Sequence, residues 1–153
     1  MTARRPGFSL VEVTFVVLFL GILARIAVPS YLDLVYRARA AAALGDLNAV
    51  RHAAFEYNVE TNRWPADVYP GIVPPELESY LGEGFTFQRE HYQLDWENWL
   101  LPDGTPKHDN DVLLGVSIVT EDAKLGEALE TVVGYDRARY TLGDNYTFII
   151  ATH

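Results

Sequence analysis

Residues 7–28 read GFSLVEVTFVVLFLGILARIAV, a nearly unbroken apolar run that follows a short basic head. Between Val13 and Ala24 no residue carries a charge. An α-helix rises about 1.5 Å per residue, so the stretch from Phe8 to Val28 would span roughly 30 Å, the thickness of a bilayer core. The run therefore predicts a helix that crosses a membrane.

Three familiar kinds of N-terminal segment fit this run only in part. A secretory signal peptide needs small residues before its cleavage site, and a cut after Ala27 would put Arg25 at the −3 position. A plain single-pass anchor explains the length of the run but not the acidic Glu12. The pair Arg4-Arg5 is typical of a twin-arginine export signal, but here the apolar stretch follows it too closely.

The start of the run carries a more specific pattern. The segment from Gly7 through Phe8 to Glu12, GFSLVE, resembles the processing site of type IV pilins and type II secretion pseudopilins. The resemblance implies that a prepilin peptidase cuts between Gly7 and Phe8 and removes a leader of residues 1–7. It also implies that Phe8 is N-methylated and that Glu12 becomes the fifth residue of the mature chain.

Two further positions match the family, and one departs from it. Gly21 and the Pro29-Ser30-Tyr31 step bracket a stretch in which glycine lowers helix propensity and proline removes a backbone hydrogen bond. The resemblance implies that the helix loosens between Gly21 and Pro29 when subunits pack into a filament. Arg25 stands where the family mostly has an apolar residue, so the depth of the helix in the membrane stays open. The resemblance covers about the first 30 residues.

Glu12 is unusual because a charge at mid-bilayer costs about 2.5–3.5 kcal/mol on insertion scales. One interpretation places it in the headgroup region at the end of the span. The other uses the ammonium group that cleavage would create on Phe8, which can pair with Glu12 of a neighbouring subunit. A buried ion pair adds little net stability but fixes register. Such head-to-tail pairing joins different surfaces and builds an open helical filament.

The basic residues predict the orientation in the membrane. By the positive-inside rule, Arg4 and Arg5 keep the leader in the cytoplasm, while Arg37 and Arg39 argue mildly for the opposite orientation. We expect a single-pass inner-membrane protein whose C-terminal domain lies in the periplasm or outside the cell, and which then joins an extracytoplasmic filament.

Composition bounds the function of the rest of the chain. The 153 residues suffice for one domain plus an extra element, and 49% of them are hydrophobic, enough for a core. A net charge of −9 argues against nucleic-acid binding, which needs a basic surface. The chain has no cysteine, which excludes disulfides, thiolate metal sites and cysteine nucleophiles.

The helical pattern resumes after Pro29. One apolar stripe at alternating spacings of four and three is formed by Tyr36, Ala40, Ala43, Leu47, Val50, Ala54 and Tyr57. Trp64-Pro65 ends the pattern. We expect one helix from about Phe8 to Asn58, with its second half packed on the chain's own sheet.

The remaining sequence predicts an α+β fold. Prolines and Gly71 mark Trp64 to Pro75 as a loop. Expected helices are Pro75–Leu81 and Asp122–Val133, and expected strands are Phe85–Glu90, Tyr92–Trp99, Val112–Thr120 and Tyr146–Thr152. The sum is a long N-terminal helix packed on an antiparallel sheet of about four strands with a small extra helix. The expected divisions are a leader (1–7), a transmembrane and filament-core helix (8–29), its amphipathic continuation (30–62) and an extracytoplasmic domain (63–153).

The body offers little sign of chemistry. The carboxylates of Asp103, Asp109 and Asp111 are of the type that binds calcium, but their spacing fits no EF-hand, and we expect a solvated turn. The histidines form no ligand pair, and neither Ser9 nor Ser117 lies in a triad pattern. The aromatics Tyr92, Trp96 and Trp99 are expected to pack the sheet. We therefore expect no catalytic residues and no resident cofactor.

The sequence thus favours a structural subunit of a type IV pilus or a type II secretion pseudopilus. Its expected partners are other pilins or pseudopilins, a prepilin peptidase, the inner-membrane assembly platform and, before assembly, the membrane itself. The alternative is a membrane-anchored periplasmic binding or enzymatic domain with a fortuitous match in its leader.

Overall fold

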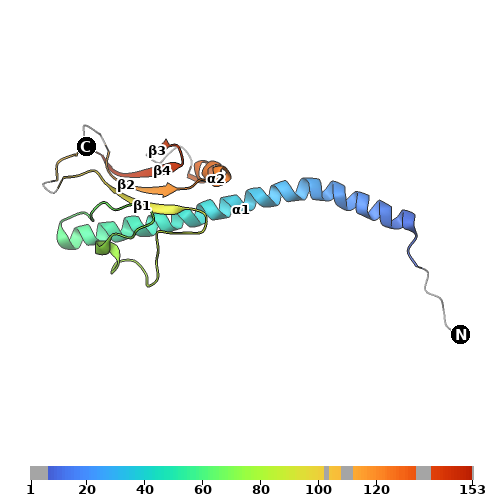
Figure 1. The fold of residues 1–153 in the computed structure, drawn as a ribbon, viewed down its shortest axis with the longest axis horizontal. Coiled ribbons are helices and arrows are strands. Elements are labelled where there is room, and N and C mark those ends of the chain that lie inside the picture. Colours follow the sequence, from blue (N-terminus) through green and yellow to red (C-terminus); the bar gives the residue numbers. More distant parts are fainter. Residues whose placement is uncertain (1–6, 102–103, 108–111, 134–138, 153) are drawn as a thin grey trace. The chain divides into compact units, whose positions relative to one another are not determined.

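The computed structural model describes residues 7–101, 104–107, 112–133 and 139–152. In chain order its elements are α1 (Leu10–Thr61), the 3₁₀ helix η1 (Pro75–Leu77), β1 (Gln93–Asn98), β2 (Val112–Val119), α2 (Ala123–Val133), β3 (Arg139–Leu142) and β4 (Asn145–Thr152) (Figure 1). The chain divides into two compact units, Met1–Val35 and Tyr36–His153. The predicted α+β class is confirmed.

The residues that flank α1 are of types that commonly begin and end helices. Ser9 precedes its first turn, and the Ser9 Oγ accepts a hydrogen bond from the Glu12 backbone N–H at 3.2 Å. The helix then runs without interruption through Gly21 and Pro29 to Thr61. Asn62 follows with φ 54°, the left-handed conformation that commonly ends a helix. The helix is three residues longer than predicted at its C-terminal end.

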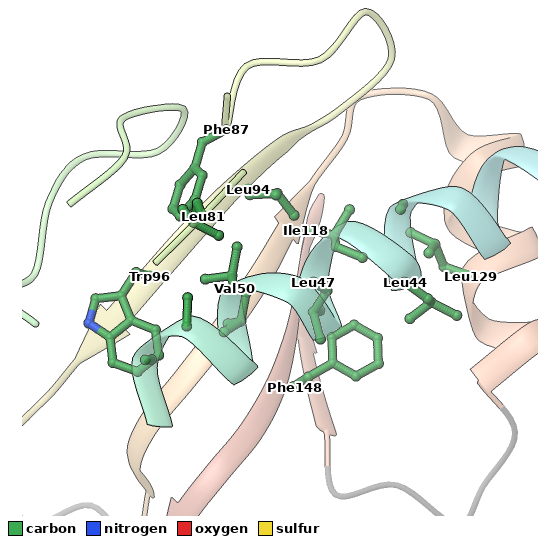
Figure 2. Packing of buried hydrophobic residues seen from close by; sticks show 14 of the residues in the cluster. Leu44, Leu47, Val50, Leu81, Phe87, Leu94, Trp96, Ile118, Leu129 and Phe148 are labelled. Carbon is green, nitrogen blue, oxygen red and sulfur yellow. The ribbon is translucent and has the colours of Figure 1, made fainter. Parts of the chain in front are cut away.

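The predicted apolar stripe is the buried face of α1 within the second unit. Leu47, Val50 and Ala54 are at most 2% exposed, and Tyr36 and Tyr57 pack at its two ends. Figure 2 shows Leu47 and Val50 pointing toward Trp96, Ile118 and Phe148 of the sheet. The helix therefore packs on the chain's own sheet, as the spacing indicated.

The sheet is antiparallel with strand order β1-β2-β4-β3 (Figure 1). Its inner face carries Leu94 and Trp96 of β1, which alternate with Asp95 and Glu97 on the opposite face. The predicted strands at Tyr92–Trp99, Val112–Thr120 and Tyr146–Thr152 are confirmed as β1, β2 and β4 within two residues at each end.

The predicted helix at Asp122–Val133 is confirmed as α2. Asp122 immediately precedes it and caps it, since its Oδ1 accepts hydrogen bonds from the backbone N–H groups of Lys124 and Leu125 at 3.0 and 3.4 Å. Leu125 and Leu129 of α2 are fully buried and extend the core at one end of the sheet.

Two predicted elements are corrected. The segment Phe85–Glu90 is not a strand and makes only an isolated bridge between Gln88 and Gln93. The Thr86 hydroxyl accepts a hydrogen bond from the Gln88 N–H, and this local bond competes with strand pairing. The helix expected at Pro75–Leu81 is only the single 3₁₀ turn of η1, followed by irregular turns.

One strand escaped prediction. β3 (Arg139–Leu142) pairs with β4 through a hairpin in which Leu142 lies opposite Asn145. Its two loop residues are Gly143, with φ 63°, and Asp144. A two-residue Gly-Asp loop between strand-like runs is a hairpin signal, so the sequence did contain the information.

Candidate functional site: the N-terminal segment of α1

The predicted processing site lies just before α1. Gly7 has no other atom within 4 Å of the position where a side chain would begin, and Phe8 is 84% exposed. Both residues precede α1, which begins at Leu10, and belong to no helix or strand. The Gly7–Phe8 bond therefore lies outside every helix and strand of the described chain.

Glu12 lies in the first turn of α1 and is exposed. A carboxylate there interacts favourably with the positive end of the helix dipole. Its backbone N–H is satisfied by Ser9, so the first turn is well formed around it. The exposed side chain thus belongs to a formed helical turn, four residues after Phe8 in the sequence.

The helix beyond Glu12 exposes an apolar surface that the first unit cannot bury by itself. Its large hydrophobic side chains between Leu10 and Val28 are each at least 48% exposed. This part of α1 includes one segment that is long and apolar enough to cross a membrane. Monomeric soluble proteins rarely expose apolar patches of this extent, so lipid or other helices must cover it.

Gly21 and Pro29 lie within this exposed segment. Nothing approaches within 4 Å of the place where a Gly21 side chain would begin, so no contact in the described chain requires glycine there. Pro29 removes one backbone donor, and the next residue, Ser30, donates its hydroxyl to the Ile26 carbonyl at 3.2 Å. The predicted loosening between Gly21 and Pro29 belongs to the assembled state and remains a prediction.

Arg25 interrupts the same surface with a positive charge. It is exposed, and within the described chain its guanidinium forms no ion pair, as is also true of the Glu12 carboxylate. The N-terminal segment thus carries two isolated opposite charges on one apolar helix.

The carboxylates considered for calcium, Asp103, Asp109 and Asp111, lie outside the described residues. Within the described ranges, no group of three or more acidic, histidine or cysteine side chains is arranged to hold a metal ion. The idea of a calcium loop therefore stays a prediction from residue type alone.

The aromatic residues of the body pack, as expected. Trp96 is fully buried and donates its Nε1–H to the Pro65 carbonyl at 3.1 Å. Trp64 stacks on Trp96 with ring centroids 6.3 Å apart and covers the core where α1 ends. Trp99 lies over Gly115 of β2, where any side chain would meet its ring.

Sequence reasoning missed a pair of acids on the outer face of the sheet, of which Asp95 is buried and Glu97 is half-buried. Asp95 is 6% exposed and its Oδ1 has no partner among the described residues. Glu97 accepts a hydrogen bond from the Ser117 hydroxyl at 3.2 Å, and Ser117 in turn contacts the Thr147 hydroxyl at 2.8 Å. The alternation of LDWE in β1 was the available signal, because it puts two acids side by side on one face.

Burial is the main reason that these two acids hold protons tightly. Loss of solvent, reinforced by the nearby Glu97 charge, raises the pKa of Asp95 to about 8. Burial also raises the pKa of Glu97, against the hydrogen bond that Ser117 donates to it. A proton held by Asp95 at neutral pH lowers the repulsion between these two adjacent carboxyl groups.

Within the second unit, an acidic residue of α1 binds two residues of the segment that precedes β1. Asp46 on α1 accepts hydrogen bonds from Arg89 Nε at 2.8 Å and from the Tyr92 hydroxyl at 2.7 Å. Burial and the bond to Asp46 raise the pKa of Tyr92, so its phenol stays protonated. The pairing of Asp46 with residues more than 40 positions away could not be foreseen from the sequence.

Curated proteins of known type share sequence with this chain. The type IV major pilin protein PilE1 of Neisseria gonorrhoeae is 32% identical over 75 residues, which is 49% of this chain and 35% of that protein. Type II secretion system core protein G of Aeromonas hydrophila is 34% identical over 89 residues, or 54% of this chain and 62% of the relative. Each of these two matches thus covers less than two thirds of this chain and less than two thirds of the relative.

A longer match extends into the body. Core protein G of Pectobacterium carotovorum subsp. carotovorum is 27% identical over 131 residues, which is 71% of this chain and 83% of that protein. No family model matches the chain. No solved structure gives a significant match either. The GFSLVE segment, the long helix on an antiparallel sheet and these relatives agree, and the chain is similar to the pilin-like proteins that include type IV pilins and type II secretion pseudopilins.

Proposed function

We propose that this chain is a structural subunit of a type IV pilus or a type II secretion pseudopilus. The observation that carries the proposal is the exposed apolar half of α1, which follows the Gly7–Phe8 site and carries Glu12 in its first turn. A folded body supplies its own core, whereas this helix needs partners to cover it. Side-by-side packing of such helices, each in a different copy, covers them.

In this proposal a prepilin peptidase cleaves after Gly7, and the new amino group of Phe8 is methylated. The ammonium of Phe8 on one subunit then pairs with Glu12 on its neighbour. Before assembly the apolar half of α1 anchors the chain in the inner membrane, with the second unit in the periplasm. The inner-membrane assembly platform then transfers the subunit into a filament with copies of itself or with related pilins.

The relatives support this assignment by their names. They are described as a major pilin and as core proteins of a secretion system, and neither description is that of an enzyme. Binding of calcium by the acidic loop is not needed for any of these steps.

The state of the mature N-terminus tests the proposal. Mass spectrometry of the chain isolated from cells with the assembly machinery should show loss of Met1 to Gly7 and one methyl group on Phe8. A matched variant, Gly7→Ala, should slow this processing. An intact N-terminus, or a cut near Ala27, would instead point to a plain anchor or a signal peptide.

A further inference from the structure

The isolated charges of the apolar helix, Glu12 and Arg25, have a defined geometric relation. They are thirteen residues apart in a continuous helix, which corresponds to roughly 20 Å along the axis and roughly 220° around it. They therefore lie on nearly opposite faces of α1. Neither has an ion-pair partner in the described chain, and both project from the surface that must be covered.

We propose that Arg25 of one copy pairs with Glu12 of a neighbouring copy that is shifted by about 20 Å along the helix axis. The proposal rests on the filament function above and adds a second contact to it. An arginine in apolar surroundings is costly unless an acid faces it. Between Phe8 and Val28, Glu12 is the only acid that a second copy can offer.

The opposite placement of the charges decides the kind of assembly. Two antiparallel helices that formed both Glu12–Arg25 pairs at once would need both charges on one face. Parallel helices in register would bring like charges together. A parallel, staggered arrangement satisfies the charges, and each copy then uses one face toward one neighbour and the other face toward the next. Such a heterologous contact does not close and continues as a filament.

This contact is compatible with the pairing of Glu12 and the Phe8 ammonium. That pairing needs a stagger of about 6 Å in one direction, because the two residues are four apart. The Arg25 contact needs a stagger of about 20 Å in the opposite direction. The two cations therefore come from different neighbours, and the two oxygens of the Glu12 carboxylate can receive one each.

Asp33, the next acid along α1, is a weaker partner for Arg25. It already takes part in an interaction within its own chain. It also lies beyond Val28, outside the apolar run, where water can solvate it. The pairing therefore selects Glu12.

Substitution of Arg25 in the full-length chain tests the pair. With the assembly machinery present, Arg25→Gln should lower filament yield about tenfold or more, because it leaves the partner acid unpaired in apolar surroundings. Arg25→Lys keeps the charge and should restore most of the yield. If Arg25→Gln assembles as well as the parent, the contact does not exist. If it assembles normally but leaves the membrane more easily, Arg25 contacts lipid headgroups instead, and the proposal is again overturned.

Cysteine cross-linking tests the stagger directly, since the chain has no cysteine of its own. On facing helices with this offset, Val16 and Val28 of adjacent copies lie close together, and both are exposed in the single chain. The double variant Val16→Cys, Val28→Cys should form a ladder of covalent multimers under oxidation. Val17→Cys with Val28→Cys is the matched control, because Val17 lies about 140° around the helix from Glu12.

Equal cross-linking by the two pairs would overturn the stagger. Filaments of processed chain that depend neither on Arg25 nor on this register would overturn only the contact. A parent chain that keeps its first seven residues and forms no filament would overturn the contact together with the proposed function.

Discussion

The acids of β1 show how a single pair of side chains can make folding depend on pH. Asp95 and Glu97 follow each other on one face of the strand, and both are largely removed from water. Hydroxyl groups of Ser117 and Thr147 continue the network across β2 and β4. With no cation bound to Asp95 in the described chain, a proton held by Asp95 offsets the repulsion.

Stability should therefore fall as pH rises through the neutral range. An unfolded aspartate titrates near pH 4, whereas Asp95 in the folded chain has a pKa of about 8. Folding takes up a proton between these values, so the contribution is fully present below about pH 4 and is lost as pH approaches 8. Uptake of the one proton on Asp95 gives a slope of at most about 1.4 kcal/mol per pH unit. Urea unfolding in detergent, followed by tryptophan fluorescence, measures it.

Asp95→Asn should flatten this pH dependence, because the amide is neutral at every pH and can still donate to Glu97. Glu90→Gln changes an acid whose side chain is 88% exposed and serves as the control. A parent protein equally stable at pH 5 and pH 8 would show that Asp95 does not hold this proton.

The helices and strands that could be predicted were those with a strong hydrophobic period in the sequence. The apolar stripe predicted the buried face of α1, and the alternation of apolar and polar residues predicted the strands β1, β2 and β4. The strand predicted at Phe85–Glu90 was wrong because the apolar residues of this segment pack into the core, as Phe87 does, and do not belong to a paired strand. β3 was missed because only four residues form it and its signal lies in the turn at Gly143.

The candidate site was proposed from the sequence for a different reason. Gly7, Phe8 and Glu12 form a local motif, so no tertiary information was needed to find them. The pairing of Asp46 with Arg89 and Tyr92, and the burial of Asp95, depend on contacts between distant segments. A single sequence contains no direct sign of such contacts.

Packing between α2 and β4 predicts opposite effects for one substitution at two helical glycines. At Gly126, a new methyl group would overlap the Tyr146 hydroxyl oxygen. Gly126→Ala should therefore destabilise the fold by about 1–3 kcal/mol, despite the better helix propensity of alanine. At Gly45 of α1 nothing lies within 4 Å, so Gly45→Ala should stabilise by about 0.5–1 kcal/mol. Chemical unfolding of both variants measures the difference, and equal effects would refute the contact.

At the scale of the whole molecule, folding of the body and the proposed assembly depend on different units. The second unit, Tyr36–His153, contains the entire buried cluster, from Ala40 on α1 to Phe148 on β4. The first unit contributes no buried residue among those described. Changes in the first unit should therefore leave unfolding of the body unaltered, whereas changes in the cluster should affect both folding and assembly.

The variant Glu12→Ala tests directly whether assembly can be lost while folding is unchanged. The variant keeps the Gly7–Phe8 site and the Ser9 cap, so expression, cleavage and the unfolding curve of the body should match the parent. Its incorporation into filaments should fall strongly, because the Phe8 ammonium of the neighbour loses its partner in an apolar bundle. Thr14→Ala is the matched control, since the Thr14 hydroxyl bonds only to the Val11 carbonyl of its own helix among the described residues. Quantifying sheared filaments against total processed protein gives the measurement. Equal assembly of Glu12→Ala and Thr14→Ala would mean that the acid serves only to place the helix at the membrane surface.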